Sequence, residues 1–257
     1  MDYTAILYEV DEHVATITLN RPDALNSFNQ TMCDEFEDVW RVIREDDDVH
    51  VVVLRAAGDR AFCTGVDVKE GIRHLDNVFS QLDPGTYLGP KQNRVWKPVV
   101  AAVHGMAAGG AMYWLNESDI IICSEDATFF DPHVTYGMTS ALEPIGMARR
   151  VPLGDVLRWA LLGLDERMSA SRALQIGLVT EVVPREELWP RADQLAKLMA
   201  AKPPTAIQGT VKAIWESLDM TRTQALEMGL SYTQLGNPIG TAMVDRATAV
   251  RPKPMIR

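Results

Sequence analysis

The sequence predicts an α/β fold in which strands occupy the first half of the chain and helices dominate the second half. Two observations support this prediction. Short apolar runs typical of buried strands alternate with turns and helical patterns from residue 6 to about residue 130. From Glu143 onward, the periodicity is almost entirely helical. We therefore expect a β/α core followed by a helical C-terminal region.

The N-terminal part is expected to contain a strand pair, a helix and a buried strand. Alternating apolar residues predict strands over 6–10 and 14–19, joined by a turn at 11–12. Apolar positions at three- and four-residue spacing predict an amphipathic helix over 29–46. The β-branched run 51–54 is typical of a buried strand.

Two glycine-containing turns come next, and each is expected to open into a helix. Residues 61–67 lead to a helical pattern that begins at Val68. The buried strand 99–103 leads through a turn over 104–110 to a helix that begins at Ala111. The first amides of a helix have no partner within it, so both turns can offer N–H donors to one oxygen atom. Tight strand-to-helix turns are also common connections in α/β folds. The pattern alone therefore leaves open whether the two turns bind an oxygen atom or only connect strands to helices.

The remaining chain is expected to add one more strand and then helices. Residues 120–123 predict a third buried strand, and Pro132 is expected to end regular pairing. Three later segments have the clearest helical pattern: 185–200, 205–218 and 221–235. We divide the chain into a core over 1–195 and a helical region with an extended tail over 196–257.

Composition excludes several classes of protein. The chain has 257 residues, of which 47% are apolar, and this is enough for a large core and excludes a disordered protein. A formal net charge of −10 gives no general attraction for nucleic acid or anionic membranes. Three separated cysteines and five histidines without ligand spacing predict neither disulfides nor a metal site. With no signal peptide or clear membrane span, a soluble cytoplasmic protein is expected.

Four motifs are distributed along residues 5–235. They are LNRPDALN at 19–26, AFCTGVDVKE at 61–70, KPVVAAVHGMAAGG at 97–110 and ALQIGLV at 173–179. In order and spacing they resemble the enoyl-CoA hydratase/isomerase, or crotonase, superfamily. The resemblance implies a crotonase-like spiral of β-β-α units whose C-terminal helices build a homotrimer or a dimer of trimers. It also implies an acyl-CoA thioester as substrate, as in fatty acid metabolism, with no cofactor besides the coenzyme A of that substrate.

The resemblance also implies a binding site for the thioester. The backbone N–H groups of Val66 and Gly110 would hold its carbonyl oxygen. Five residues would lie along the adenine and pantetheine path: Ala24, Leu25, Ala61, Thr64 and Asp67. Lys69 and Lys97 are candidate phosphate partners, and a solvated surface position is the alternative for each.

The chain departs from the family hydratases at the two glutamates that handle water and the α-proton. Tyr113 and His133 stand at these positions, and no gap is needed to align them. A tyrosine, with an ordinary pKa of about 10, is poorly matched to activating water. The sequence therefore argues against ordinary enoyl-CoA hydration.

Three residues are candidates for acid/base chemistry. Glu143 lies where some family isomerases carry one acidic residue that moves a proton between the α and γ carbons; a carboxylate at a helix N-terminus is the alternative. His133 has a suitable pKa and Asp131 nearby to orient it, or it is a hydrogen-bonded loop histidine. Tyr113 either points its hydroxyl at the thioester or packs as an aromatic residue.

The leading hypothesis is an enzyme that stabilises an enolate at Val66 and Gly110 and moves one proton with Glu143, assisted by His133. Isomerisation needs one carboxylate, whereas hydration needs a base and an acid. The alternatives are a non-standard hydratase that uses His133 and Tyr113, and an acyl-CoA-binding protein without catalysis. The segment 72–95 is expected to wall the acyl pocket, but its pattern identifies no functional residue.

Overall fold

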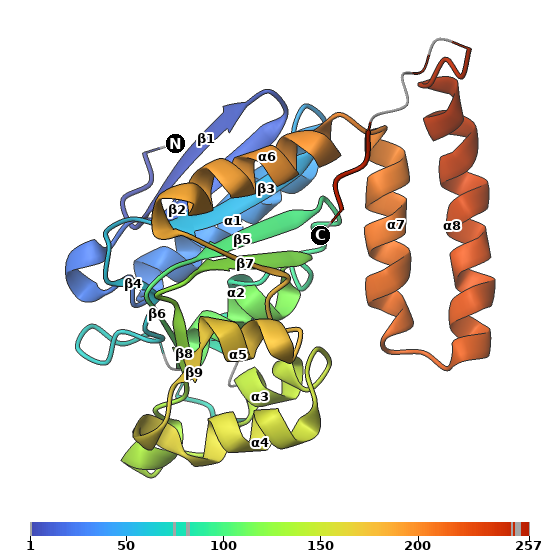
Figure 1. The fold of residues 1–257 in the computed structure, drawn as a ribbon. Helices are drawn as coiled ribbons and strands as arrows, with labels where there is room; N and C mark the ends of the chain where they lie inside the picture. Colours follow the sequence, from blue (N-terminus) through green and yellow to red (C-terminus); the bar gives the residue numbers. More distant parts are fainter. Residues whose placement is uncertain (1, 74–75, 81–82, 248, 250–252, 257) are drawn as a thin grey trace. The chain divides into compact units, whose positions relative to one another are not determined.

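The computed structural model describes residues 2–73, 76–80, 83–247, 249 and 253–256 (Figure 1). The chain divides into two compact units, Met1–Ala200 and Ala201–Arg257. The boundary that the sequence suggested, after residue 195, falls inside the last helix of the first unit, whose alanines are buried in that unit's core.

The first unit is built around a six-stranded sheet with the strand order β1-β2-β3-β5-β7-β10. Its strands are β1 (Ile6–Asp11), β2 (Val14–Leu19), β3 (Val51–Ala56), β5 (Val99–Val103), β7 (Ile120–Ser124) and β10 (Glu181–Val183). The β1–β2 pair is antiparallel, and all the other neighbours are parallel. The strands expected at 6–10, 14–19, 51–54, 99–103 and 120–123 are thus confirmed.

A second, four-stranded sheet has the order β4-β6-β8-β9. Its strands are β4 (Ala61–Cys63), β6 (Met106–Ala108), β8 (Thr128–Phe130) and β9 (Met168–Ser169). The strands β4, β6 and β8 directly follow β3, β5 and β7, so three successive passes of the chain each place one strand in each sheet. This repetition is the spiral that the family resemblance implies.

Helices cover both faces of the six-stranded sheet (Figure 1). The first unit contains α1 (Gln30–Glu45), α2 (Met112–Glu117), α3 (Leu142–Met147), α4 (Leu153–Leu161), α5 (Ala170–Gln175) and α6 (Leu188–Ala200). Because successive strand residues point to opposite faces, Val51 and Val53 share one buried cluster with α6, whereas Val52 and Leu54 share the other with α1. The sheet is therefore buried on both sides, as its run of β-branched residues predicts.

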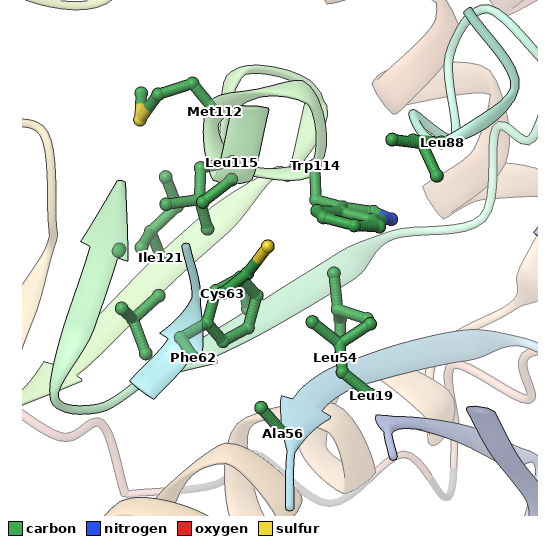
Figure 2. Close-up of a cluster of buried hydrophobic side chains, with 14 of the residues drawn as sticks. Leu19, Leu54, Ala56, Phe62, Cys63, Leu88, Met112, Trp114, Leu115 and Ile121 are labelled. Carbon is green, nitrogen blue, oxygen red and sulfur yellow. The ribbon is translucent and has the colours of Figure 1, made fainter. Parts of the chain in front are cut away.

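A buried cluster fixes the start of α2, next to the second glycine turn. Figure 2 shows Trp114 and Leu115 of α2 facing Cys63 of β4 and Leu54 of β3. All four side chains are completely buried. Since α2 begins directly after Gly109–Ala111, this packing also holds the backbone of the turn.

The structure differs from the local expectations in three places. No helix begins at Val68: the Asp67 side chain accepts bonds from the N–H groups of Lys69 and Glu70, and the turn ends at Gly71 with a φ of +69°. The turn expected over 104–110 contains strand β6 and a 3-10 turn, so α2 begins at Met112. A third difference is that the largely helical C-terminal half also contributes the short strands β9 and β10, which the sequence did not predict.

The second unit contains two helices, α7 (Pro204–Ser217) and α8 (Arg222–Ala242), which pack against each other. Thr221 and Gln224 form a capping box at the start of α8. Across the described residues, no helix combines the length and apolarity that a bilayer span requires.

The structure contradicts the phosphate role considered for Lys97. Its side chain is only 3% exposed, and its ammonium donates to the carbonyl oxygens of Ile43 (2.5 Å) and Asp46 at the end of α1. Burial lowers the pKa of Lys97, while the nearby Asp46 carboxylate opposes that change. The lysine is therefore a helix C-terminal cap.

Substituting Lys97→Met is expected to lower the free energy of unfolding by about 2 kcal/mol, because two hydrogen bonds from a charged donor are lost. The exposed Lys69→Met variant serves as the control and should change stability little. Urea unfolding of both variants measures the difference. Equal stability of Lys97→Met and the wild type would contradict the capping role.

Candidate active site

A cavity of about 720 Å³ lies where the two glycine turns meet the loop after β8. Its walls include ten of the residues that the sequence singled out: Ala24, Leu25, Thr64, Val66, Asp67, Lys69, Gly110, Tyr113, His133 and Glu143. Ala61 does not line it. This residue is buried in β4, where its carbonyl accepts a 2.9 Å hydrogen bond from the Asn26 amide.

The two glycine turns converge. A Cβ atom built on Gly65 would lie 3.3 Å from the backbone nitrogen of Gly110, so the two turns are in contact. Gly65 has a φ of +88°, a conformation that favours glycine. The two turns therefore lie close enough for their N–H groups to share one oxygen atom.

Within the described part of the chain, no backbone acceptor is recorded for the N–H groups of Val66 and Gly110. Phe28 and Val66 form an isolated parallel β-bridge. In this bridge, the N–H of Phe28 donates to the carbonyl of Gly65 (2.9 Å), and the N–H of Asp67 donates to the carbonyl of Phe28 (2.8 Å). The N–H of Val66 takes no part in either bond. Gly110 is the second residue of a 3-10 turn, where an N–H has no acceptor within the turn. Both amides belong to cavity-lining residues.

Gly110 is required because an aromatic ring lies against it. A Cβ atom at this position would lie 2.5 Å from Cε1 of Phe28. The Phe28 ring packs edge-on against Tyr113 and Trp114, with centroid distances of 6.2 and 5.8 Å. The floor of the cavity next to the amide pair is thus apolar and rigid, which strengthens hydrogen bonds to an oxyanion.

Three titratable side chains form a row: His133 and Glu143 line the cavity, and Asp131 lies buried behind His133. The ring Nδ1 of His133 lies 2.5 Å from Oδ1 of Asp131, and Nε2 lies 3.9 Å from Oε1 of Glu143. Asp131 is fully buried and also accepts bonds from the backbone N–H of His133 and the hydroxyl of Ser140. The chain bends at Pro132, and this bend brings the carboxylate to the imidazole. The expectation that Asp131 orients His133 is confirmed.

The surroundings of the three side chains shift the pKa of each one. Burial raises the pKa of Glu143 above that of an ordinary glutamate. The hydrogen bond to Asp131 raises the pKa of His133, and burial only partly opposes this effect. Burial alone would raise the pKa of Asp131, but the hydrogen bonds from His133 and Ser140 lower it. These shifts favour the anionic form of Asp131 and the protonated forms of His133 and Glu143.

Tyr113 has a partner that the sequence did not reveal. Its hydroxyl donates a 2.9 Å hydrogen bond to Oδ1 of Asp83, and Asp83 also lines the cavity. Burial, aided by the charges of Glu143 and Asp83, raises the pKa of Tyr113. The Asp83-Pro84-Gly85 sequence was an available signal, because an aspartate before proline often caps a turn.

The alternating placement of strands in two sheets, with paired glycine turns between them, defines a crotonase-type fold. The sequence model of the family described as Enoyl-CoA hydratase/isomerase matches residues 9–235. The chain belongs to this family.

Individual relatives have different activities. The chain is 33% identical to an (E)-benzylidenesuccinyl-CoA hydratase of Thauera aromatica, over 90% of this chain and 88% of that protein. It is 30% identical to a 1,2-epoxyphenylacetyl-CoA isomerase of Escherichia coli, with coverage of 90% and 89%. A solved enoyl-CoA hydratase/isomerase from Mycobacterium paratuberculosis superposes with a TM-score of 0.83 at 38% identity, covering 91% of this chain and 90% of that one. Family membership therefore leaves the reaction open.

Proposed function

We propose that the protein is an enzyme that forms an enolate from an acyl-CoA thioester. The observation that carries the proposal is the convergence of the Val66 and Gly110 turns in the same cavity as His133 and Glu143, with Asp131 bonded to His133. An amide pair and a proton-transfer group within one cavity are what enolisation of a thioester requires.

In the proposed reaction, the thioester oxygen accepts hydrogen bonds from Val66 N–H and Gly110 N–H. These bonds stabilise the negative charge that develops on oxygen when the α-proton leaves, at about 3 kcal/mol per donor. The Glu143 carboxylate takes that proton, and the C–H electron pair becomes part of the enolate. Returning the proton to the γ-carbon of an unsaturated acyl group completes an isomerisation. A protonated His133, held by Asp131, stabilises the Glu143 carboxylate across 3.9 Å.

The remaining cavity residues suit the coenzyme A part of the substrate. Ala24, Leu25, Thr64 and Asp67 provide a partly apolar channel for the pantetheine and adenine. The exposed Lys69 forms no ion pair with another described residue and is placed to meet a phosphate. We further propose that the chain works in the cytoplasm as a homotrimer or a dimer of trimers.

Exchange of the α-protons of saturated acyl-CoAs with D2O tests this function. The rate should fall as the pH drops through the pKa of Glu143, because only the carboxylate accepts a proton. Since burial raises that pKa, the decline should begin at a higher pH than an ordinary glutamate would give. Mass spectrometry measures the exchange. Tight binding of acyl-CoAs without exchange at any pH would instead support a binding protein without catalysis.

A further inference from the structure

The carboxylate of Asp83 also lines the cavity, on a segment that the mechanism above does not use. Asp83 belongs to the loop before a short 3-10 turn, Pro84–Tyr87, whereas Glu143 belongs to α3. Both line the same cavity, and the charge of Asp83 contributes to the raised pKa of Glu143. The positions of the two family glutamates hold Tyr113 and His133, yet the carboxylates of Asp83 and Glu143 reach the cavity from other elements.

The two oxygens of Asp83 have different surroundings. Oδ1 accepts hydrogen bonds from the backbone N–H of Gly85 (3.0 Å) and the hydroxyl of Tyr113 (2.9 Å). Oδ2 has no hydrogen-bond or ion-pair partner among the residues that the structure describes. One oxygen therefore anchors the carboxylate, and the other keeps its lone pairs for a water molecule or a substrate hydroxyl.

The loop closely surrounds the Tyr113 ring. A Cβ atom on Gly85 would lie 2.1 Å from Cε1 of Tyr113, so only glycine allows this approach. The other side of the ring lies 3.4 Å from the Cβ position of Gly110, beside the proposed oxyanion pocket. Tyr113 thus connects the oxyanion turn to Asp83, and its proton is already donated to the carboxylate. Tyr113 is a positioning residue rather than the base.

We propose that Asp83 is a catalytic base that activates water for addition to a 2-enoyl-CoA, with Tyr113 positioning it. This inference rests on the proposed enolate chemistry. Asp83 Oδ2 removes a proton from water, and the water oxygen forms a bond to the β-carbon. The electron pair of the C=C bond moves to give the enolate, whose oxygen is held by Val66 and Gly110. The protonated Glu143 then delivers a proton to the α-carbon, and solvent carries the proton from Asp83 back to Glu143.

The experiment compares two reactions of the same enzyme. Addition of H2(18)O to straight-chain and phenyl-substituted 2-enoyl-CoAs reports on Asp83, and α-proton exchange of saturated acyl-CoAs reports on the enolate site. Asp83→Asn should lower the rate of water addition by about 10²-fold or more, so that the ratio of addition to exchange falls at least tenfold. Asp83→Glu should recover part of the addition. Tyr113→Phe should lower kcat for addition more than it changes KM, because the Asp83 carboxylate loses the hydrogen-bond donor that holds it in place.

The exposed Asp76→Asn variant, from the same segment, is the matched control for surface charge, and thermal unfolding checks that each variant folds. Absence of exchange in the wild type would refute the enolate function itself. Exchange without addition of labelled water to any of these enoyl-CoAs would overturn only the role of Asp83. Equal losses of both reactions in Asp83→Asn would overturn it as well, because they would indicate a structural role.

Discussion

The Glu143→Gln variant is expected to exchange α-protons about 10³-fold more slowly than the wild type, the size of effect that a positioned acid/base group contributes. Glutamine keeps the shape of the side chain but cannot accept the proton. The backbone of α3 should stay in place, since the Glu143 carbonyl still accepts its 2.9 Å hydrogen bond from the Asn116 amide. Mass spectrometry of deuterium uptake at the α-carbon measures the rate.

The exposed Glu125→Gln variant removes a carboxylate that does not line the cavity and should leave the exchange rate within twofold of the wild type. Affinity for the acyl-CoA should survive in Glu143→Gln, because the amide pair is intact. An exchange rate within threefold of the wild type would show that Glu143 does not carry the proton.

Elements with a long apolar pattern could be predicted from the sequence, and short ones could not. The strands β1, β2, β3, β5 and β7 and helix α1 each carry a periodic pattern that local physics explains. The strands β4, β6 and β8 have three residues each, too few for a period to emerge. They are strands because each pairs with residues far along the chain, as β6 does with β4 and β8.

The site divides in the same way. Val66 and Gly110 lie in two of the four motifs, and His133 and Glu143 were identified by their positions relative to family residues; all four line the cavity. Asp83 escaped notice because its neighbour in the site, Tyr113, is 30 residues away in sequence. The buried position of Lys97 could not be predicted for the same physical reason. Its burial depends on the carbonyls that end α1, about 50 residues earlier, and no local pattern reports such contacts.

The amide pair can be tested by a substitution that blocks it without removing a side chain. Gly65→Ala places a methyl group 3.3 Å from the Gly110 nitrogen and from the Ala108 carbonyl oxygen, where neighbouring atoms must shift. Displacement of one oxyanion donor costs about 10²–10³-fold in rate. We therefore expect α-proton exchange to fall by that factor, with affinity for the coenzyme A part less affected.

Gly71→Ala is the matched control for this experiment. Gly71 has a φ of +69°, close to the +88° of Gly65, but a Cβ atom there meets no atom within 4 Å. Both variants carry the backbone strain of an L-residue in the left-handed region, about 1–2 kcal/mol, and urea unfolding should show similar losses of stability. Only Gly65→Ala should lose exchange, because only its methyl group reaches the Gly110 amide. Equal losses of exchange in the two variants would assign the defect to strain and remove the support for an oxyanion pocket at these turns.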